Sequence, residues 1–429
     1  MTAPDVEEQP RGLFRPRRSS FSSYTLLLVT GMLFTGTCNT ILNKVQDMQC
    51  VENCDDPDPS KHKYFEQPIY QTLNMFIGEL ACLLAVADRA KEKLSLKRSE
   101  LESRMQAKHD AVEDLSDVIS ESIRVEVANA MAGRKPLTNF ARLLFWIPTM
   151  CDICGTTLMN VGLIYTTASI YQMLRGAVVI FSAILSMVFL RHRIALFQWF
   201  ALTAVMAGVS VVGLSGIIGA PSTPQPPLSD DDNGPDAQSE IEDVARAALG
   251  IFMVLFAQMF TATQFVVEER ILKRYAVDPL MAVGLEGFWG CVTVITAMPL
   301  LHFTLGTMHP GGFFDIYAGW HQFWDNEMVW RVGIAFALSI SLFNWFGLSV
   351  TRSLSSVARA TIDTCRTLFI WMVSMSLGWE DFRWLQVLGF AMLVYGTFLY
   401  NGVVEPPKWL RRPRDTESIE ETEPILPRE

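Results

Sequence analysis

The chain is a series of apolar runs separated by blocks of charged residues. Each run is near the ~20 residues that an α-helix needs to cross the hydrocarbon of a bilayer. Because the backbone must satisfy its own hydrogen bonds there, a continuous apolar run predicts a helix rather than an alternating barrel strand. The pattern therefore predicts an all-α polytopic membrane protein with ten transmembrane helices. They are placed at about 22–43, 67–87, 143–166, 169–190, 196–218, 247–267, 279–302, 330–350, 355–377 and 384–404.

The composition agrees with a membrane protein. Of the 429 residues, 50% are hydrophobic and 19% are charged, whereas soluble proteins have about 25% charged residues. The mean hydropathy is +0.24. The acidic excess behind the net charge of −10 lies in loops and in the C-terminal tail. The lipid bilayer is therefore the expected partner, and no nucleic-acid binding is expected.

Lys and Arg residues are distributed unevenly between the connecting loops, which predicts the orientation in the membrane. One side holds 25 of them, in the two tails and in the loops after the second, fourth, sixth and eighth spans. The opposite loops hold only Lys61, Lys63 and Arg383, with three more basic residues at span edges. Both termini are therefore predicted to face the cytosol.

Two halves of five spans each are separated by a polar segment. This segment contains several prolines and the run Asp230–Asp232, which predicts an acidic, disordered loop on the lumenal side. The predicted parts are the cytosolic tail 1–21, the first half 22–218 with a cytosolic loop at 88–137, the lumenal loop 219–246, the second half 247–404 and the cytosolic tail 405–429.

The two halves show a repeat. When the second half is shifted by 188 residues, Gln386 aligns with Gln198 and Gly396 with Gly208. Because each half has an odd number of spans, the two copies must point in opposite directions across the membrane. Inverted repeats are a recurring architecture of secondary transporters, which bind substrate near the midplane between the repeats.

Three motifs carry a resemblance to a known family. They are QMLRG at 172–176, a glutamate pair at 268–269 followed by AVGLEG at 282–287, and TIDTCRT at 361–367. In this order they resemble the drug/metabolite transporter superfamily, and especially the F branch of solute carrier family 35. The resemblance covers most of residues 22–404. It implies ten helices in two inverted halves, alternating access and a cavity lined by the fourth and ninth spans. Because relatives include nucleotide-sugar transporters and a drug-resistance transporter, it implies a class and no particular cargo.

Charged side chains inside the spans carry the functional predictions, because each costs at least ~2.5 kcal/mol at the bilayer centre. Arg359, Asp363 and Arg366 lie on one face of the ninth span, four and three residues apart, and can pair within the helix. Two interpretations stay open. The three residues form either a structural triad that holds a helix interface or a charged lining of the substrate cavity.

Arg175 in the fourth span has no counter-charge on its own helix, and Gln172 lies one turn before it. Arg175 must therefore find a carboxylate on another helix, for which Asp152 is suggested, or an anionic ligand that suits its bidentate guanidinium. Both alternatives stay open. The predicted substrate-binding residues are Arg175, Gln172, Asp152, Asn160, Asp363, Arg366 and Arg359.

Glu79 and Glu286 are predicted carriers of coupling protons, because buried carboxylates can titrate near neutral pH. A hydrogen bond to a neighbouring helix is the alternative for each. Glu268 and Glu269 lie at a predicted cytosolic helix end, where solvent is expected to surround them.

The cysteines suggest one structural bond and no metal site. Cys50 and Cys54 lie in the predicted lumenal loop, where an oxidising environment would allow a disulfide, and this pairing stays open. Cys151 and Cys154 form a CxxC inside the third span. Zinc would need further soft ligands, and no histidine lies in the core of a span. The pair is therefore expected to pack helices, and no metal or cofactor is expected.

The tail carries a predicted sorting signal. Glu421, Ile425 and Leu426 match an acidic dileucine pattern, E-x-x-x-I-L, which sorting adaptors would read from the cytosol. Together with the family resemblance, this pattern favours a lysosomal or vacuolar membrane, with the Golgi membrane as the alternative.

Two functions of different classes remain. The leading hypothesis is a secondary transporter of a small polar metabolite, anionic or zwitterionic, that works by alternating access. The alternative is a scaffold or regulatory protein that kept a transporter fold without transport. An enzyme is not expected, because the chain has no HExxH helix and no Ser–His arrangement in its core, and the absence of a P-loop argues against direct use of ATP. The oligomeric state stays open, with a homodimer among the options.

Overall fold

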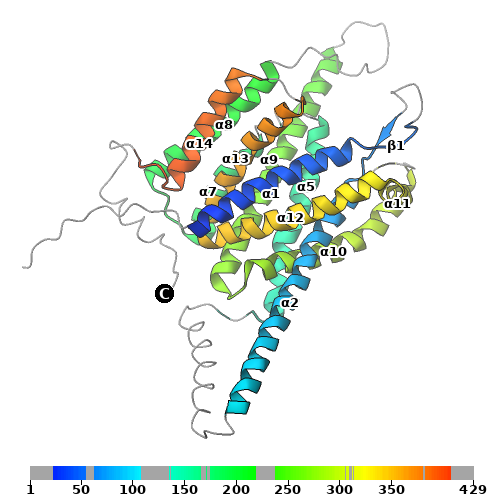
Figure 1. The fold of residues 1–429 in the computed structure, drawn as a ribbon. Coiled ribbons are helices and arrows are strands. Elements are labelled where there is room, and N and C mark those ends of the chain that lie inside the picture. Colours follow the sequence, from blue (N-terminus) through cyan, green and yellow to red (C-terminus); the bar gives the residue numbers. More distant parts are fainter. Residues whose placement is uncertain are drawn as a thin grey trace, which may run out of the picture.

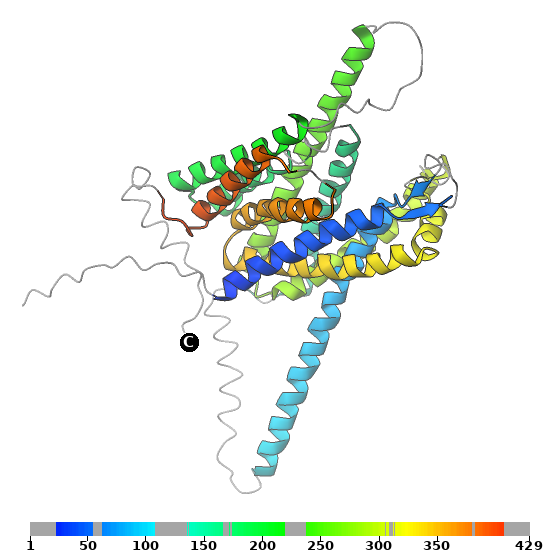
Figure 2. The same cartoon turned by 45° about the horizontal axis from the view of Figure 1, so that its top comes forward.

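The computed structural model of the chain is mostly helical, with one two-stranded hairpin (Figure 1; Figure 2). It describes residues 23–54, 62–107, 135, 137–165, 171, 174–218, 237–304, 306–308, 312, 314–379 and 382–406. The elements of the first half are α1 (Ser23–Asp47), β1 (Cys50–Glu52), β2 (Lys63–Tyr64), α2 (Pro68–Ala107), α4 (Asn139–Arg142), a 3-10 turn (Leu143–Phe145), α5 (Trp146–Tyr165), α7 (Val178–Leu190) and α8 (Leu196–Ile218). Those of the second half are α9 (Ala237–Arg274), α10 (Pro279–Thr304), a 3-10 turn (Gly306–Met308), α11 (Ile316–Trp324), α12 (Glu327–Ser353), α13 (Ser356–Ser376) and α14 (Trp384–Tyr400).

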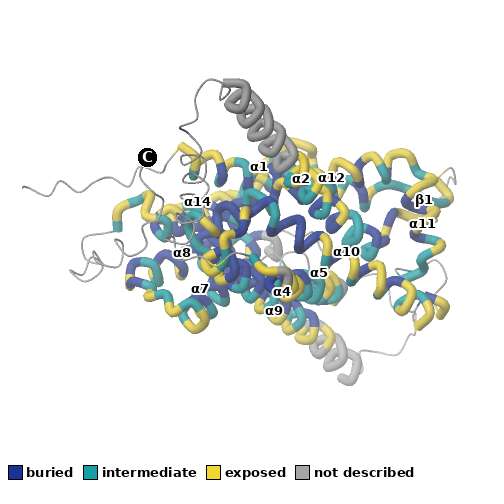
Figure 3. The backbone as a smooth tube through the Cα atoms, turned by 90° about the horizontal axis from the view of Figure 1, so that it is seen from below, coloured by how far each residue is buried: buried dark blue, intermediate teal, exposed yellow. Residues whose placement is uncertain are grey.

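Six of the described helices are long and apolar enough to cross a membrane: α1, α2, α8, α9, α10 and α12. Helices α7 and α14 are apolar but shorter. The outside of the bundle exposes large apolar side chains such as Leu27, Phe34 and Leu338, while buried positions gather where the helices meet (Figure 3). Such a surface is unfavourable in water and suited to lipid. The prediction of a helical, multi-pass membrane protein is therefore confirmed.

Three helices differ from the predicted spans. Within the predicted span 169–190, helix α7 begins only at Val178, because Gly176 and Ala177 form a turn. Helix α2 continues past the predicted end at residue 87 to Ala107 as a long arm (Figure 2). Its extension contains no Gly or Pro and many Lys, Glu and Arg residues, which favour a helix. Helix α9 begins at Ala237, inside the loop predicted at 219–246.

The helices pack in pairs that join distant parts of the chain. α1 packs on α12, α2 on α10, α5 on α9 and α8 on α14, and Figure 1 shows α1 beside α12 and α8 beside α14. Helix α13 contacts α1, α7, α9, α12 and α14. This central position surrounds the three charged residues of α13 with other helices.

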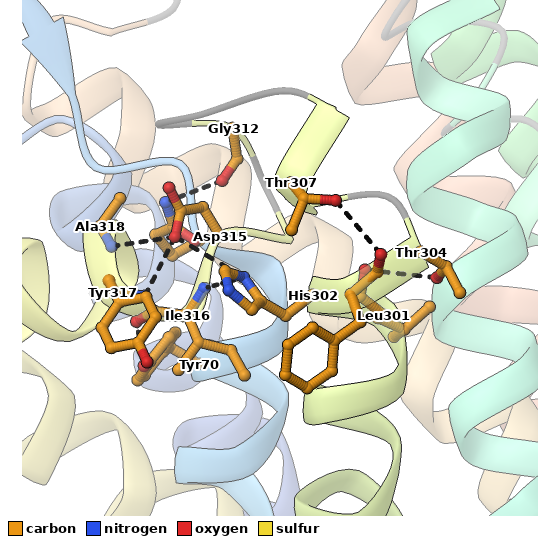
Figure 4. Close-up of polar contacts among 12 residues, drawn as sticks. Tyr70, Leu301, His302, Thr304, Thr307, Gly312, Asp315, Ile316, Tyr317 and Ala318 are labelled. Carbon is orange, nitrogen blue, oxygen red and sulfur yellow. Dashed lines mark hydrogen bonds and ion pairs between the residues drawn. The ribbon is translucent and has the colours of Figure 1, made fainter.

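One end of the bundle is organised by the short helix α11 (Figure 4). Asp315 caps this helix, because its Oδ1 accepts hydrogen bonds from Tyr317 N at 3.1 Å and from the next amide. His302 at the end of α10 accepts a hydrogen bond at its Nδ1 from Ile316 N at 3.4 Å. Tyr70 of α2 donates its hydroxyl to Ile316 O at 2.7 Å. These bonds fasten α11 to α2 and α10.

The hairpin lies at the same end. β1 and β2 pair antiparallel, and a disulfide joins Cys50 to Cys54. Asn326, which caps α12, donates its Nδ2 to Cys50 O at 2.8 Å. The hydrogen bond of Lys63 to Glu52 across the hairpin holds the pKa of the Glu52 carboxyl below its usual value, although burial opposes this shift. The disulfide-bearing loop is thus tied to the start of α12.

Candidate functional site

Helix α13 carries two arginines into the interior of the bundle. Ser355 begins the helix, and its Oγ accepts a hydrogen bond from Ala358 N at 3.1 Å, as an N-cap residue does. Arg359 and Arg366 are only 2% and 7% exposed. Because seven residues separate them, they lie on nearly the same helix face, roughly 10 Å apart along its axis. α13 thus presents two guanidiniums at two depths.

Arg359 is bound to helix α9. Its Nη1 donates a hydrogen bond to Glu268 Oε2 within an ion pair, and Glu268 is 1% exposed. The guanidinium also lies 4.1 Å from the centre of the Phe265 ring. Gly347 of α12 makes room for it, since a Cβ there would lie 2.8 Å from Arg359 Nε. A charge-assisted pair this deeply buried fixes α13 against α9.

Four carboxylates surround Arg359, and we call them the acidic cluster: Glu79 of α2, Asp152 of α5, Glu268 of α9 and Glu286 of α10. Each of Glu79, Asp152 and Glu286 interacts electrostatically with both Glu268 and Arg359. Asn344 of α12 donates its Nδ2 to Glu79 Oε1 at 2.5 Å. If every member were ionised, the acidic cluster with Arg359 would carry a net charge of −3.

The second arginine belongs to a group of opposite sign, the basic cluster: Arg175, Asp363 and Arg366. Arg366 Nη2 lies 3.3 Å from Asp363 Oδ2, and its guanidinium lies 4.9 Å from the centre of the Phe343 ring. Arg175 interacts electrostatically with Arg366. With two guanidiniums and one carboxylate, the basic cluster carries a net charge of +1.

Exposure separates the charged groups into two kinds. Asp152, Arg175 and Asp363 are partly exposed, whereas the others of both clusters are buried. Some buried polar atoms have no hydrogen-bond partner within the described part of the chain, and buried polar atoms are normally satisfied by protein, water or ligand. They are Glu268 Oε1, Glu286 Oε1, Asp363 Oδ1, Arg359 Nε and Arg366 Nε. A polar molecule that reaches the partly exposed groups therefore meets unused hydrogen-bonding capacity behind them.

The structure divides the predicted triad of α13. Asp363 pairs with Arg366, whereas Arg359 reaches across to Glu268 on α9. It also separates the suggested pair of Arg175 and Asp152, because Asp152 lies within the acidic cluster. Arg175 instead lies 5.9 Å from the centre of the Tyr171 ring.

Some predicted residues lie apart from both clusters. Asn160 is exposed on α5, about two turns beyond Asp152. Gln172 falls outside the described residues, as does the predicted sorting signal of Glu421, Ile425 and Leu426. Within the described residues no group of three His, Cys, Asp or Glu side chains could hold a metal ion.

Sequence reasoning missed Glu268 and Glu269. The prediction that solvent surrounds them is wrong, because they are 1% and 0% exposed. The N-terminal end of α13 covers them: Glu268 pairs with Arg359, and Glu269 Oε2 accepts a hydrogen bond from Ser356 N at 2.8 Å. A local signal existed, because Gln264 lies one turn before Glu268 and hydrogen-bonds to it. The two polar side chains lie one turn apart on one face of the helix.

Comparison with known proteins supports the resemblance. A family model described as CRT-like, chloroquine-resistance transporter-like, matches residues 124–228. Solute carrier family 35 member F6 of Homo sapiens is 34% identical over 391 residues, which are 90% of this chain and 91% of that protein. An uncharacterized protein of Schizosaccharomyces pombe is 33% identical over 89% of this chain and 99% of its own. The chain belongs to solute carrier family 35.

Membership in this solute carrier family indicates a membrane transporter and favours it over an enzyme. The member F6 protein of Mus musculus gives a similar match, 32% identical over 90% of this chain. A solved crystal structure matches this carrier with a TM-score of 0.52, over 88% of this chain and 96% of that one. Its sequence identity is 10%, so this likeness concerns the fold alone.

Proposed function

We propose that this chain is a secondary transporter that moves a small polar metabolite, anionic or zwitterionic, across its membrane by alternating access. One observation carries the proposal: two interior charge clusters of opposite sign lie roughly 10 Å apart along one face of α13. Buried charges are costly in a membrane protein and commonly mark a substrate or ion pathway. A scaffold would gain nothing from them.

The partly exposed groups suggest how cargo would bind. Arg175 offers a guanidinium whose fork matches a carboxylate or phosphate, and no ion pair among the described residues occupies it. Asp152 stands on the acidic side, where it would attract a cationic group. A cargo with an anionic end, and with or without a cationic end, fits this arrangement.

The acidic cluster supports coupling to protons. Leaving a net charge of −3 buried is unfavourable because each uncompensated charge loses its hydration. Protonation of Glu79 or Glu286 would relieve the excess, and Glu286 Oε1 has no hydrogen-bond partner within the described residues. Since Arg359 interacts electrostatically with both carboxyls, movement of α13 would change which of them holds a proton.

The packing of the helices supports two inverted halves of five helices. Matching α1, α2, α5, α7 and α8 to α9, α10, α12, α13 and α14 pairs the most extensive helix contacts with counterparts. The contact of α1 with α12 corresponds to that of α9 with α5, and the contact of α1 with α13 to that of α9 with α7. Three contacts map onto themselves when the two halves are exchanged, because each joins a helix to its own counterpart: α2–α10, α7–α13 and α8–α14. An approximate twofold relation between two halves produces this pattern.

Contacts between single residues of α8 and α14 support the same proposal. A Cβ on Gly396 would lie 2.8 Å from Ala201 O, and a Cβ on Gly208 would lie 2.6 Å from Gly389 O. Shifting Ala201 forward and Gly396 back by 188 residues gives Gly389 and Gly208. The first contact thus becomes the second, as expected at a twofold axis between repeats.

Flux in proteoliposomes that contain only this protein tests the proposed function. A panel of amino acids, short peptides, organic acids and nucleotide sugars would be assayed with and without a pH gradient. We expect saturable flux of at least one anionic or zwitterionic compound. A thermal unfolding assay would establish that the protein is folded. Absence of flux across the panel from such folded protein would favour the scaffold alternative.

Variants of two arginines distinguish a role in cargo binding from a role in stability. Arg175→Ala should leave the thermal stability unchanged and abolish flux, because Arg175 is partly exposed and forms no ion pair with the residues that the structure describes. Arg175→Lys should retain weak flux, since it keeps the charge but loses the fork. Arg366→Ala is the matched control and should lower stability, because it strands the Asp363 carboxylate. Loss of folded Arg175→Ala protein would contradict the role in binding.

The proposed orientation places both termini and the arm of α2 in the cytosol. A cysteine at Ser103 should therefore react with an impermeant maleimide applied from the cytosol, and a cysteine at Ser229 only from the lumen. Labelling of Ser229→Cys from the cytosol would reject the ten-helix arrangement.

The tail is proposed to direct the protein to a lysosomal or vacuolar membrane. Replacing Ile425 and Leu426 together with alanine should redirect a fluorescent fusion to the cell surface or the Golgi. Glu405→Ala, upstream in the same tail, serves as the control. An unchanged location of the double variant would show that Ile425 and Leu426 are not part of a sorting signal.

A further inference from the structure

Three helices meet at the end of the bundle where α7 and α9 terminate and α13 begins. Helix α7 ends at Leu190, and Arg191 adopts a left-handed conformation with φ of 56°. This turn brings the chain back toward α7, so that His192 N donates to Ser186 O at 3.4 Å. His192 thereby faces helix α9, at the position where α9 also contacts the start of α13.

Glu269 is the hub of this region. It is 0% exposed, and its Oε2 accepts a hydrogen bond from Ser356 N at 2.8 Å. Its Oε1 lies 2.6 Å from Lys273 Nζ and 3.7 Å from His192 Nε2. One carboxylate therefore joins α9 to the first turn of α13 directly, and to the turn after α7 through Lys273, which also contacts His192. We call Glu269, Lys273, His192 and Ser356 the Glu269 clasp.

The hydrogen bonds of His192 define its tautomer. Lys273 Nζ only donates, so it donates to His192 Nε2 at 3.0 Å. Nδ1 then carries the ring proton and donates to Ser186 Oγ at 3.0 Å. Burial, together with the Lys273 ammonium, lowers the pKa of His192, while Glu269 opposes this shift. The ring is therefore neutral near pH 7, and Lys273 supplies the positive charge of the clasp.

An apolar layer lies immediately inside the clasp. It consists of buried side chains from the same helices, with α8 behind them: Val178, Val179 and Ala183 of α7, Leu202 and Val205 of α8, Ala262 and Phe265 of α9, and Val357 and Ala360 of α13. Phe265 touches the guanidinium of Arg359. From the end of α9 inward, the clasp residues Lys273 and Glu269 are followed by Glu268 of the acidic cluster and then by Phe265 and Ala262 of the apolar layer.

We propose that the Glu269 clasp is a gate: it holds this end of the cargo path closed and opens when cargo passes to or from that side. The inference rests on the proposed transport function. It explains why two adjacent carboxylates differ in role, since Glu268 belongs to the charged interior and Glu269 fastens the helix ends that cover it. Because α7 and α13 correspond to each other in the proposed repeat, their ends are the ones that must separate in alternating access.

Cysteine labelling in proteoliposomes that expose the clasp outward tests the gate without any cargo. Ala183 is 0% exposed, so Ala183→Cys should react very slowly with an impermeant maleimide while the gate is closed. Adding Glu269→Gln removes the ion pair to Lys273 and should speed labelling about tenfold, which corresponds to ~1.4 kcal/mol. Protein with only the native cysteines gives the blank. Arg274→Gln, a charge change on the same helix end and outside the clasp, should leave the rate unchanged.

Lys273→Met keeps the test decisive if Glu269→Gln does not fold. Lys273 is exposed on α9, so its replacement should be tolerated, and it removes the contacts to both Glu269 and His192. Faster labelling in folded Lys273→Met protein supports the gate, and an unchanged rate overturns it. An unchanged rate in folded Glu269→Gln protein overturns it as well. Absence of wild-type flux across the metabolite panel would count against the proposed function instead, whatever the labelling rates.

Discussion

Arg359→Ala is expected to lower the free energy of unfolding by about 3–5 kcal/mol, because it leaves the buried carboxylate of its ion-pair partner without a counter-charge. The removed guanidinium is 2% exposed, holds Glu268 and is the centre of the acidic cluster. Thermal unfolding of the purified protein, followed by fluorescence-detected size exclusion, would measure the effect. Arg359→Lys should recover part of the loss, since it restores the charge without the planar fork.

A double variant separates the pairing from the packing. Arg359→Met with Glu268→Gln removes both charges of the pair while keeping similar volumes, and such replacements are often neutral for stability. We expect it to fold better than Arg359→Ala and to lack flux, because the charge of the acidic cluster has changed. Normal stability of Arg359→Ala would show that the ion pair does not hold α13 against α9.

Glu286→Gln and Glu79→Gln are expected to abolish accumulation of cargo driven by a pH gradient while leaving exchange at equal pH on both sides. A glutamine cannot hold and release a proton, but it keeps nearly the same shape. Glu79→Gln can also keep its contact with Asn344. Flux in proteoliposomes with and without an imposed gradient would distinguish the two activities.

Asp278→Asn supplies the control for the loss of a carboxylate. Asp278 is exposed just before α10, the helix that carries Glu286, and should affect neither activity. Gradient-driven accumulation that survives in both Glu79→Gln and Glu286→Gln would contradict proton coupling through the acidic cluster. Loss of exchange together with accumulation would instead assign these carboxyls to cargo binding or folding.

The sequence by itself determined where most helices lie and which family the chain belongs to. Hydropathy is a local property, because twenty consecutive apolar residues require a helix in lipid whatever surrounds them. The predicted starts of α8, α10 and α14 coincide with the structure. Local reasoning also identified the rare charged residues, since their cost in the membrane does not depend on their partners. It failed at Gly176, where a turn interrupts an apolar run.

Only the tertiary structure decided which charges meet. The sequence indicated that Arg359, Asp363 and Arg366 could pair within their own helix, and it predicted that solvent surrounds Glu268 and Glu269. In the fold, Arg359 reaches Glu268 across 91 residues of chain, and Ser356 reaches Glu269 across 87. Electrostatic energy depends on separation in space and on burial, and neither follows from spacing along one helix. The packing of α13 among α1, α7, α9, α12 and α14 therefore determined the charged site and the clasp that covers it.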